Sequence, residues 1–308
     1  LKLIAQAKDA TEQAKLIVEH KIPYRVAATV IRGMQPPVIA ALINAMSPQE
    51  LINNMASLKR RGALEHKALK SLIDEKLTSA QRDKRVSAYK AKEAIKAAGL
   101  SGEVADKLDE VTERRIKAKG TIRRATAILV DKSGSMVEAI ELGKRLASMI
   151  SAVIEAPFYV YAFDTMAHAI EVPEDGSLKA WEEAFDGIVA IGGTSCGIGI
   201  EWLRRKKQRV EQIIMISDQG ENSQPLFVPA YNGYAGDFEP PHVVFVRTQG
   251  ASDYLERQCK TKGIDFDSYQ FDGDYYALPN LVPLIAQPSK IDLVMEIMDT
   301  ALPARRSA

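Results

Sequence analysis

The pattern of apolar residues changes near Gly120, and this change limits the fold more than any other feature of the chain. Residues 1–119 show only helical spacing, in segments of about 10–15 residues joined by short loops, which is typical of stacked helix pairs. From Thr121 onward, short apolar runs alternate with helical segments, a pattern that predicts a mostly parallel sheet covered on both faces. The sequence therefore predicts an α-helical repeat domain over residues 1–119 and an α/β doubly wound domain over residues 120–308.

Most individual elements can be placed from periodicity and end signals. Ser47, Pro48 and Glu50 form a strong start signal, with Ser as N-cap, Pro in the first turn and Glu at the third position. The helices expected in the first domain cover residues 1–20, 26–32, 38–45, 48–58, 66–76, 79–97 and 102–117. The strands expected in the second domain cover residues 125–130, 158–161, 167–172, 212–217, 242–247 and 265–270. Its helices are expected at residues 136–154, 178–185, 197–207, 252–262 and 291–300.

The formal net charge of +1 hides two halves of opposite sign. Residues 1–124 contain 25 Lys and Arg against 14 Asp and Glu, a net charge of +11. The remaining residues contain 16 basic and 26 acidic side chains, a net charge of −10. A basic half indicates a surface for a polyanion, and an acidic half indicates a cation site or another acidic role. The alternative reading is that the two halves attract each other across an interface.

Composition excludes several classes of protein. No apolar run approaches the roughly 20 residues that a membrane span needs. Cys196 and Cys259 lack zinc-type spacing, and two cysteines in 308 residues predict a reducing compartment, so we expect a cytoplasmic location. The chain begins at Leu1 inside a helical pattern, which leads us to expect that upstream sequence is missing.

Oxygen-bearing side chains occur at three places beside the predicted elements of the second domain. Asp131, Ser133 and Ser135 come directly after an apolar strand, Thr194 lies in a glycine-rich loop before a helix, and Asp218 ends another apolar strand. The carboxyl edge of an open α/β sheet is where ligands bind, so these side chains are expected to converge there. Carboxylates and hydroxyls are hard ligands that suit Mg²⁺ or a similar divalent cation. A helix cap and turn without metal is the competing interpretation of the first of these stretches.

The three stretches, in this order, resemble the metal-ion-dependent adhesion site of von Willebrand factor A domains. The resemblance covers about residues 121–300 and implies a Rossmann-like fold with a metal held by Asp131, Ser133, Ser135, Thr194 and Asp218. In that family the metal normally binds a partner, often through an acidic residue, and performs no chemistry. The sequence departs from the family at Gln219, because the usual glycine after the third-loop Asp stands one place later, at Gly220.

Two stretches resemble the Ro/TROVE family of RNA-binding proteins. Residues 46–55 are similar to a segment in which a Met-Pro step leads into a helix carrying Leu-x-x-Asn-(Leu/Met), although Ser47 here separates Met46 from Pro48. Residues 192–196 resemble that family's Gly-Gly-Thr-Asp-Cys loop, with Ser195 in place of Asp. The resemblance implies HEAT-like helical repeats joined to a von Willebrand factor A domain, and binding of Y-type or misfolded RNA in ribonucleoprotein particles. About 120 helical residues are few for the family's full ring, so a partial TROVE-like domain is expected.

Clusters of basic residues in the first domain are the candidate phosphate contacts. Lys and Arg on helix surfaces give salt-dependent binding to nucleic acid that is independent of sequence. The candidates are Lys59, Arg60, Arg61, Arg82, Lys84, Arg85, Arg114, Arg115, Lys117 and Lys119. Solvated helix faces are the competing interpretation of any one cluster.

These features together predict a non-enzymatic protein that binds small noncoding or misfolded RNA and serves RNA quality control. The alternative is a protein-interaction module whose Mg²⁺ site captures an acidic residue of a partner protein. A Mg²⁺-dependent hydrolase is the weakest of the three hypotheses, since the sequence offers no clear general base.

Overall fold

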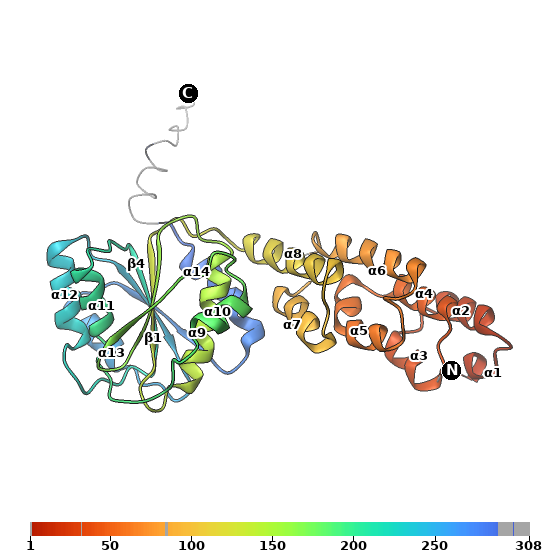
Figure 1. Cartoon of the computed structure of the whole chain (residues 1–308), viewed down its shortest axis with the longest axis horizontal. Coiled ribbons are helices and arrows are strands. Elements are labelled where there is room, and N and C mark those ends of the chain that lie inside the picture. The colour runs from red at the N-terminus through yellow and green to blue at the C-terminus, as the bar shows by residue number, and fades with distance from the viewer. Residues whose placement is uncertain (1, 32, 84–85, 289–297, 299–308) are drawn as a thin grey trace, which may run out of the picture. The chain divides into compact units, whose positions relative to one another are not determined.

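The protein consists of two compact units, Leu1–Ala118 and Lys119–Ala308, shown in Figure 1. The computed structural model describes residues 2–31, 33–83, 86–288 and 298. The division falls two residues before Gly120, where the apolar pattern of the sequence changes. Each unit has its own buried apolar core.

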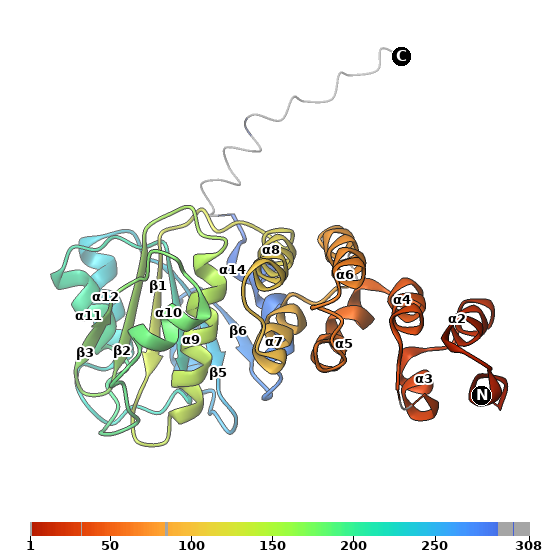
Figure 2. The same ribbon diagram turned by 45° about the vertical axis from the view of Figure 1, so that its right-hand side comes forward.

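The first unit is built from helices alone. Even-numbered helices form one layer and odd-numbered helices the other, as Figure 2 shows, with α2 against α4, α4 against α6 and α5 against α7. Leu51, Ile52, Met55 and Leu58 form the buried side of α5 at i, i+4 and i+7 spacing, which is why this stretch folds as an amphipathic helix. The helices are α1 (Lys2–Gln6), α2 (Ala10–Glu19), α3 (Tyr24–Val30), α4 (Pro36–Ala45), α5 (Pro48–Arg60), α6 (Lys67–Ala80), α7 (Ala88–Ala98) and α8 (Glu103–Lys117).

Two predicted helix boundaries in this unit are wrong. The helix expected over residues 1–20 is two helices, because the Asp9 side chain accepts hydrogen bonds from the backbone N–H groups of Thr11 (2.9 Å) and Glu12 (2.8 Å) and so starts α2. The helix expected over residues 79–97 begins only at Ala88. Ser79 instead belongs to the last turn of α6. In both places a polar stretch has the spacing expected within a helix but lies at a helix end. Asp9 caps α2, and Ser79 lies in the last turn of α6.

The second unit is a six-stranded sheet between two layers of helices. Its strand order is β3-β2-β1-β4-β5-β6, and all neighbours are parallel except β2 and β3. Every residue of β1 and β4 is buried, as expected for parallel strands covered on both faces. The strands are β1 (Thr126–Asp131), β2 (Phe158–Phe163), β3 (Ala167–Ile170), β4 (Gln212–Ser217), β5 (His242–Arg247) and β6 (Phe266–Gln270).

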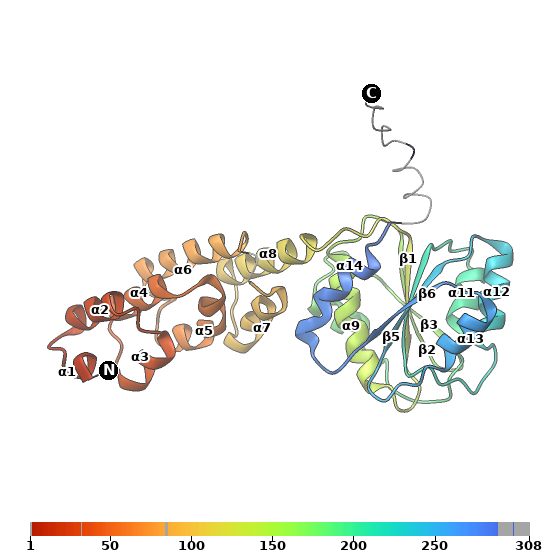
Figure 3. The ribbon, with the colours of Figure 1, turned by 180° about the vertical axis from the view of Figure 1, so that it is seen from behind.

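Helices cover both faces of this sheet, as seen from behind in Figure 3. On one face lie α9 (Val137–Ser151), α10 (Leu178–Ala184) and α14 (Val282–Ile285), and on the other lie α11 (Ile198–Arg205), α12 (Phe227–Asp237) and α13 (Tyr254–Lys262). The helix α12 and the short 3₁₀ helix η1 (Tyr275–Leu281) were not predicted. The helix predicted over residues 291–300 lies outside the described residues, apart from residue 298. Within the described ranges, no helix combines the length and apolar character that crossing a membrane requires.

Candidate functional site

Three loops meet at the carboxyl edge of the sheet in the second unit. The first loop (residues 131–135) begins at the last residue of β1, the second loop (residues 191–195) precedes α11, and the third loop (residues 217–220) begins at the last residue of β4. The Gly134 N–H donates to the Gly192 carbonyl at 3.2 Å, which joins the first loop to the second. The Asn222 N–H, two residues past the third loop, donates to the Thr194 carbonyl at 2.9 Å. Hydrogen bonds between the backbones therefore bring the three predicted stretches to one place.

Asp131 is the buried carboxylate of this edge, with none of its surface exposed. Its Oδ1 accepts from the Ser133 N–H at 2.9 Å, and its Oδ2 accepts from the Ser217 hydroxyl at 2.7 Å. Burial raises the pKa of Asp131, against the hydrogen bonds from Ser133 and Ser217 that lower it, and the neighbouring Asp218 raises it further. A buried carboxylate whose ionised form is disfavoured gains most from a bound cation.

The other predicted ligands also carry hydroxyl or carboxylate oxygens. Ser133 and Thr194 are buried, Ser135 is exposed, and Asp218 is half-buried with its Oδ1 accepting from the Gly220 N–H at 2.8 Å. Within the part of the chain that the structure describes, no three His, Cys, Asp or Glu side chains gather to hold a metal. A metal at this edge would therefore depend on the hydroxyls as well as on Asp131 and Asp218. Such hard oxygen donors fit Mg²⁺ and do not fit a softer metal.

A buried ion pair beside the first loop was not predicted. The Lys132 ammonium donates to Asp164 Oδ2 at 2.6 Å, and the two side chains are 6% and 13% exposed. Lys132 also binds the second loop, since its carbonyl accepts from the Ile191 N–H at 2.8 Å. The Asp164 carbonyl accepts from the Ser195 N–H at 2.8 Å, next to Thr194. The backbone carbonyls of the two paired residues therefore hold the second loop on both sides of Thr194. The sequence carried one signal for this pair: Asp164 is a charged residue within residues 158–167, which are otherwise apolar or small.

The predicted phosphate contacts fall into two groups. Several already bond within the protein: the Lys59 ammonium donates to the carbonyls of Ala98 (3.0 Å) and Gly99 (2.6 Å), Arg61 Nε donates to the Tyr24 hydroxyl at 3.2 Å, and the Lys119 ammonium donates to Asn280 Oδ1 at 2.6 Å.

The second group faces solvent. Arg60, Arg82, Arg114 and Lys117 are exposed, and Arg115 is half-buried. The side chains of Arg60, Arg82 and Arg114 make no hydrogen bond or ion pair with any described residue. Lys84 and Arg85 lie outside the described residues. Arg60, Arg82 and Arg114 are therefore the strongest remaining candidates.

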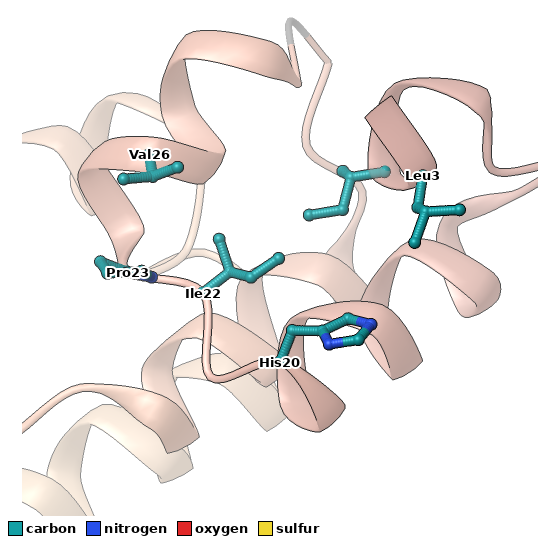
Figure 4. Close-up of a pocket in the computed structure, with 6 residues that line it drawn as sticks. Leu3, His20, Ile22, Pro23 and Val26 are labelled. Carbon is teal, nitrogen blue, oxygen red and sulfur yellow. The ribbon is translucent and has the colours of Figure 1, made fainter. Parts of the chain in front are cut away.

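An apolar cavity of about 310 Å³ lies at the end of the first unit where the chain begins (Figure 4). Its lining is almost entirely apolar, and His20 is the one titratable side chain among the residues that form it. The remaining lining residues are Leu3, Ile4, Ile22, Pro23 and Val26. None of the predicted metal or phosphate contacts lines this cavity.

Comparison with known proteins gives a match at the level of structure only. No protein-family model matches the chain, and no curated protein sequence matches it. The crystal structure of the Deinococcus radiodurans Ro protein (RSR) is similar with a TM-score of 0.60 and 18% sequence identity, over 91% of this chain and 61% of that chain. A von Willebrand factor type A structure from Catenulispora acidiphila matches 54% of this chain and 42% of that chain, with 17% identity and a TM-score of 0.42.

The match to the Ro structure includes both units, since it extends over 91% of the chain. The chain spans about three-fifths of the length of that Ro protein. The predicted fold class, helical repeats followed by a doubly wound α/β domain, is confirmed by this match and by the observed strand order. The chain therefore shares the fold of the part of the Ro structure that it matches, a helical unit followed by a doubly wound α/β domain.

Proposed function

We propose that this chain binds RNA through the first unit, without catalysis. The observation that carries the proposal is the charge of that unit: residues 1–118 contain 22 Lys and Arg against 14 Asp and Glu, a net charge of +8. Arg60, Arg82 and Arg114 are exposed and unpaired among the described residues. Exposed guanidinium groups bind phosphate oxygens, and release of counterions drives that binding.

The Ro-type fold supports small RNA as the ligand. Ro/TROVE proteins, which the sequence resembles, bind small noncoding RNAs and misfolded RNAs, so we expect a Y-type or misfolded RNA in a ribonucleoprotein particle. The second unit is net acidic, and its carboxyl edge carries Asp131 and Asp218. Phosphates would be repelled there, which favours the first unit as the RNA surface.

The test is RNA affinity measured across a range of salt concentrations. A labelled single-stranded RNA of about 20 nucleotides should bind the wild type with an affinity that falls steeply as salt rises. The triple variant Arg60→Gln, Arg82→Gln, Arg114→Gln should bind more weakly, and the slope of log affinity against log salt should fall by roughly 2, at about 0.7 for each single-strand phosphate contact.

A matched control removes the same number of charges from the second unit. The variant Lys179→Gln, Lys206→Gln, Lys262→Gln changes exposed cations there and should keep the wild-type slope. Absence of RNA binding by the wild type at low salt would refute the proposal. Equal losses in both triple variants would show that only the total charge matters.

A second candidate function is the binding of a partner carboxylate through Mg²⁺ at the carboxyl edge of the sheet. It is favoured by the convergence of three loops around the buried carboxylate of Asp131. When bound, the metal would be held by Asp131, Ser133, Ser135, Thr194 and Asp218 and would supply an open coordination position. Calorimetry with Mg²⁺ tests it: Asp131→Ala should abolish binding, and RNA affinity should be unchanged.

A further inference from the structure

Gln219 has a backbone conformation that residues other than glycine rarely adopt. Its φ angle is +66°, in the left-handed region, at the position where von Willebrand factor A domains usually have glycine. A side chain in this region is crowded by the following carbonyl group, so some other interaction must hold it there. The side chain of Gln219 is 1% exposed, which shows that it is part of the packed interior rather than a loop tip.

The Gln219 side chain binds the start of α13. Its Oε1 accepts from the backbone N–H groups of Leu255 (3.1 Å) and Glu256 (3.3 Å), two groups in the first turn that the helix itself leaves unsatisfied. Its Nε2 donates to Glu256 Oε1 at 2.7 Å. The same Glu256 oxygen accepts from the Ser268 hydroxyl at 2.8 Å. Each polar atom of the amide is thus used, and the third loop is fixed to α13.

The backbone of Gln219 is linked to the buried carboxylate of Asp131 through the Ser217 hydroxyl. Its N–H donates to the Ser217 hydroxyl oxygen at 3.0 Å, and that hydroxyl donates to Asp131 Oδ2 at 2.7 Å. The two residues that flank Gln219 are also bonded to each other, because the Gly220 N–H donates to Asp218 Oδ1 at 2.8 Å. The left-handed turn at Gln219 therefore determines where both Ser217 and Asp218 lie relative to Asp131.

We propose that Gln219 is a positioning residue for the cation site. Its side chain is anchored on α13, and this anchor holds the left-handed turn that a glycine would adopt freely. The proposal rests on the Mg²⁺ site inferred above. The anchor holds Asp218 and the Ser217 hydroxyl in place, so that the oxygens are arranged before the cation arrives. Gln219 itself does not contact the cation.

The experiment compares Gln219→Gly, Gln219→Ala and the wild type in Mg²⁺ calorimetry and thermal unfolding. Glycine adopts the left-handed turn without strain, but Gln219→Gly leaves Glu256 and the Leu255 N–H without the bonds of the anchor. Its melting temperature should therefore fall by less than that of Gln219→Ala, and it should bind Mg²⁺ about tenfold more weakly than the wild type. Gln219→Ala lacks the anchor and keeps the strain, so both the melting temperature and the affinity should fall. Hydrogen exchange at the Gly220 N–H should be faster in both variants than in the wild type without metal.

Ser268→Ala is the matched control, since it removes a hydrogen bond to Glu256 at the end of the cluster far from Asp218. It should lower the melting temperature and leave the Mg²⁺ dissociation constant unchanged. If the wild type binds Mg²⁺ and Gln219→Gly binds it equally well, the positioning role is overturned and the metal site stands. If the wild type does not bind Mg²⁺, the metal site fails and the positioning role fails with it.

Discussion

Replacing Lys132 by Met should destabilise the second unit by about 3 kcal/mol at neutral pH. The ammonium of Lys132 is 2.6 Å from Asp164 Oδ2, and the two side chains are 6% and 13% exposed. Removing one partner of a buried pair leaves an uncompensated charge, which costs roughly 3–5 kcal/mol. Asp164 keeps one hydrogen bond, from the Met166 N–H at 2.8 Å, its Oδ1 lies 3.5 Å from His168 Nε2, and it retains slight contact with solvent. These remaining interactions place the cost at the lower end of that range.

The stability lost in Lys132→Met should depend on pH in a definite direction. Burial raises the pKa of Asp164, but the hydrogen bonds from Lys132 and Met166 outweigh it and leave the pKa below its usual value. A carboxyl group with a lowered pKa stabilises the fold above its unfolded pKa of about 3.9, and this stabilisation is lost as the pH falls through the folded value. Without Lys132, burial should raise the pKa of Asp164, so the variant takes up a proton on acidification. The difference in the free energy of unfolding between the variant and the wild type should therefore shrink as the pH falls from 7 to about 4.

The assay is urea unfolding followed by tryptophan fluorescence, because both tryptophans, Trp181 and Trp202, lie in the second unit. The matched variant Lys132→Met, Asp164→Leu removes the whole pair without leaving a charge and should recover most of the lost free energy of unfolding. A loss below about 1 kcal/mol for Lys132→Met at pH 7, or a loss that does not change with pH, would refute the reasoning.

Two further predictions concern a helix start and the thiols. Ser47→Ala removes a hydroxyl that accepts from the Glu50 N–H at 3.3 Å within a capping box, so the first unit should lose about 1 kcal/mol, seen as faster hydrogen exchange in α5, while the exposed Ser71→Ala should change nothing. Burial raises the pKa of Cys196 well above its usual value and that of Cys259 to about 12. Neither thiol should react with a disulfide reagent at pH 8 until urea unfolds the second unit, and fast reaction of the folded protein would contradict this.

The sheet was predictable because burial of strands on both faces leaves a clear mark in the sequence. All six predicted strands are present, and the expected ranges 212–217 and 242–247 agree with β4 and β5 at both ends. The central parallel strands β1, β4 and β5 lie under two layers of helices and are mostly buried apolar runs. The carboxyl edge follows from the same pattern, since it is fixed once the strands and their direction are known.

The helix α12 could not be predicted, for a physical reason. It contains Pro229, Gly233 and Gly236, residues that weaken or interrupt an isolated helix. Its aromatic residues hold it in place, because Phe227 stacks on Tyr231 and packs against Phe245 of β5. Packing against the sheet overrides the low local propensity of this stretch. Such an override depends on contacts between distant segments, which periodicity within the stretch does not report.

At the candidate site, too, some residues could be predicted from the sequence, whereas the roles of others follow only from contacts in the structure. Strand ends indicated Asp131 and Asp218, because they bring polar side chains to one edge, and a glycine-rich loop before a helix indicated Thr194. Lys132 and Gln219 occupy positions that no pattern constrains, and their roles come from partners far along the chain, Asp164 and Glu256. The departure from glycine at Gln219 was visible in the sequence, but its compensation by an anchor on α13 was not.

Charge separates the two proposed functions of the chain. A Mg²⁺ ion at the carboxyl edge would neutralise the two carboxylates, Asp131 and Asp218, and leave no surplus positive charge there to attract phosphate. The surplus lies on the first unit, where Arg60, Arg82 and Arg114 are exposed. An open coordination position on a neutralised site selects a single oxygen ligand such as a carboxylate, whereas several exposed guanidinium groups select a polyanion. If both proposals hold, the two units therefore suit different ligands, a polyanion for the first unit and a single carboxylate for the second.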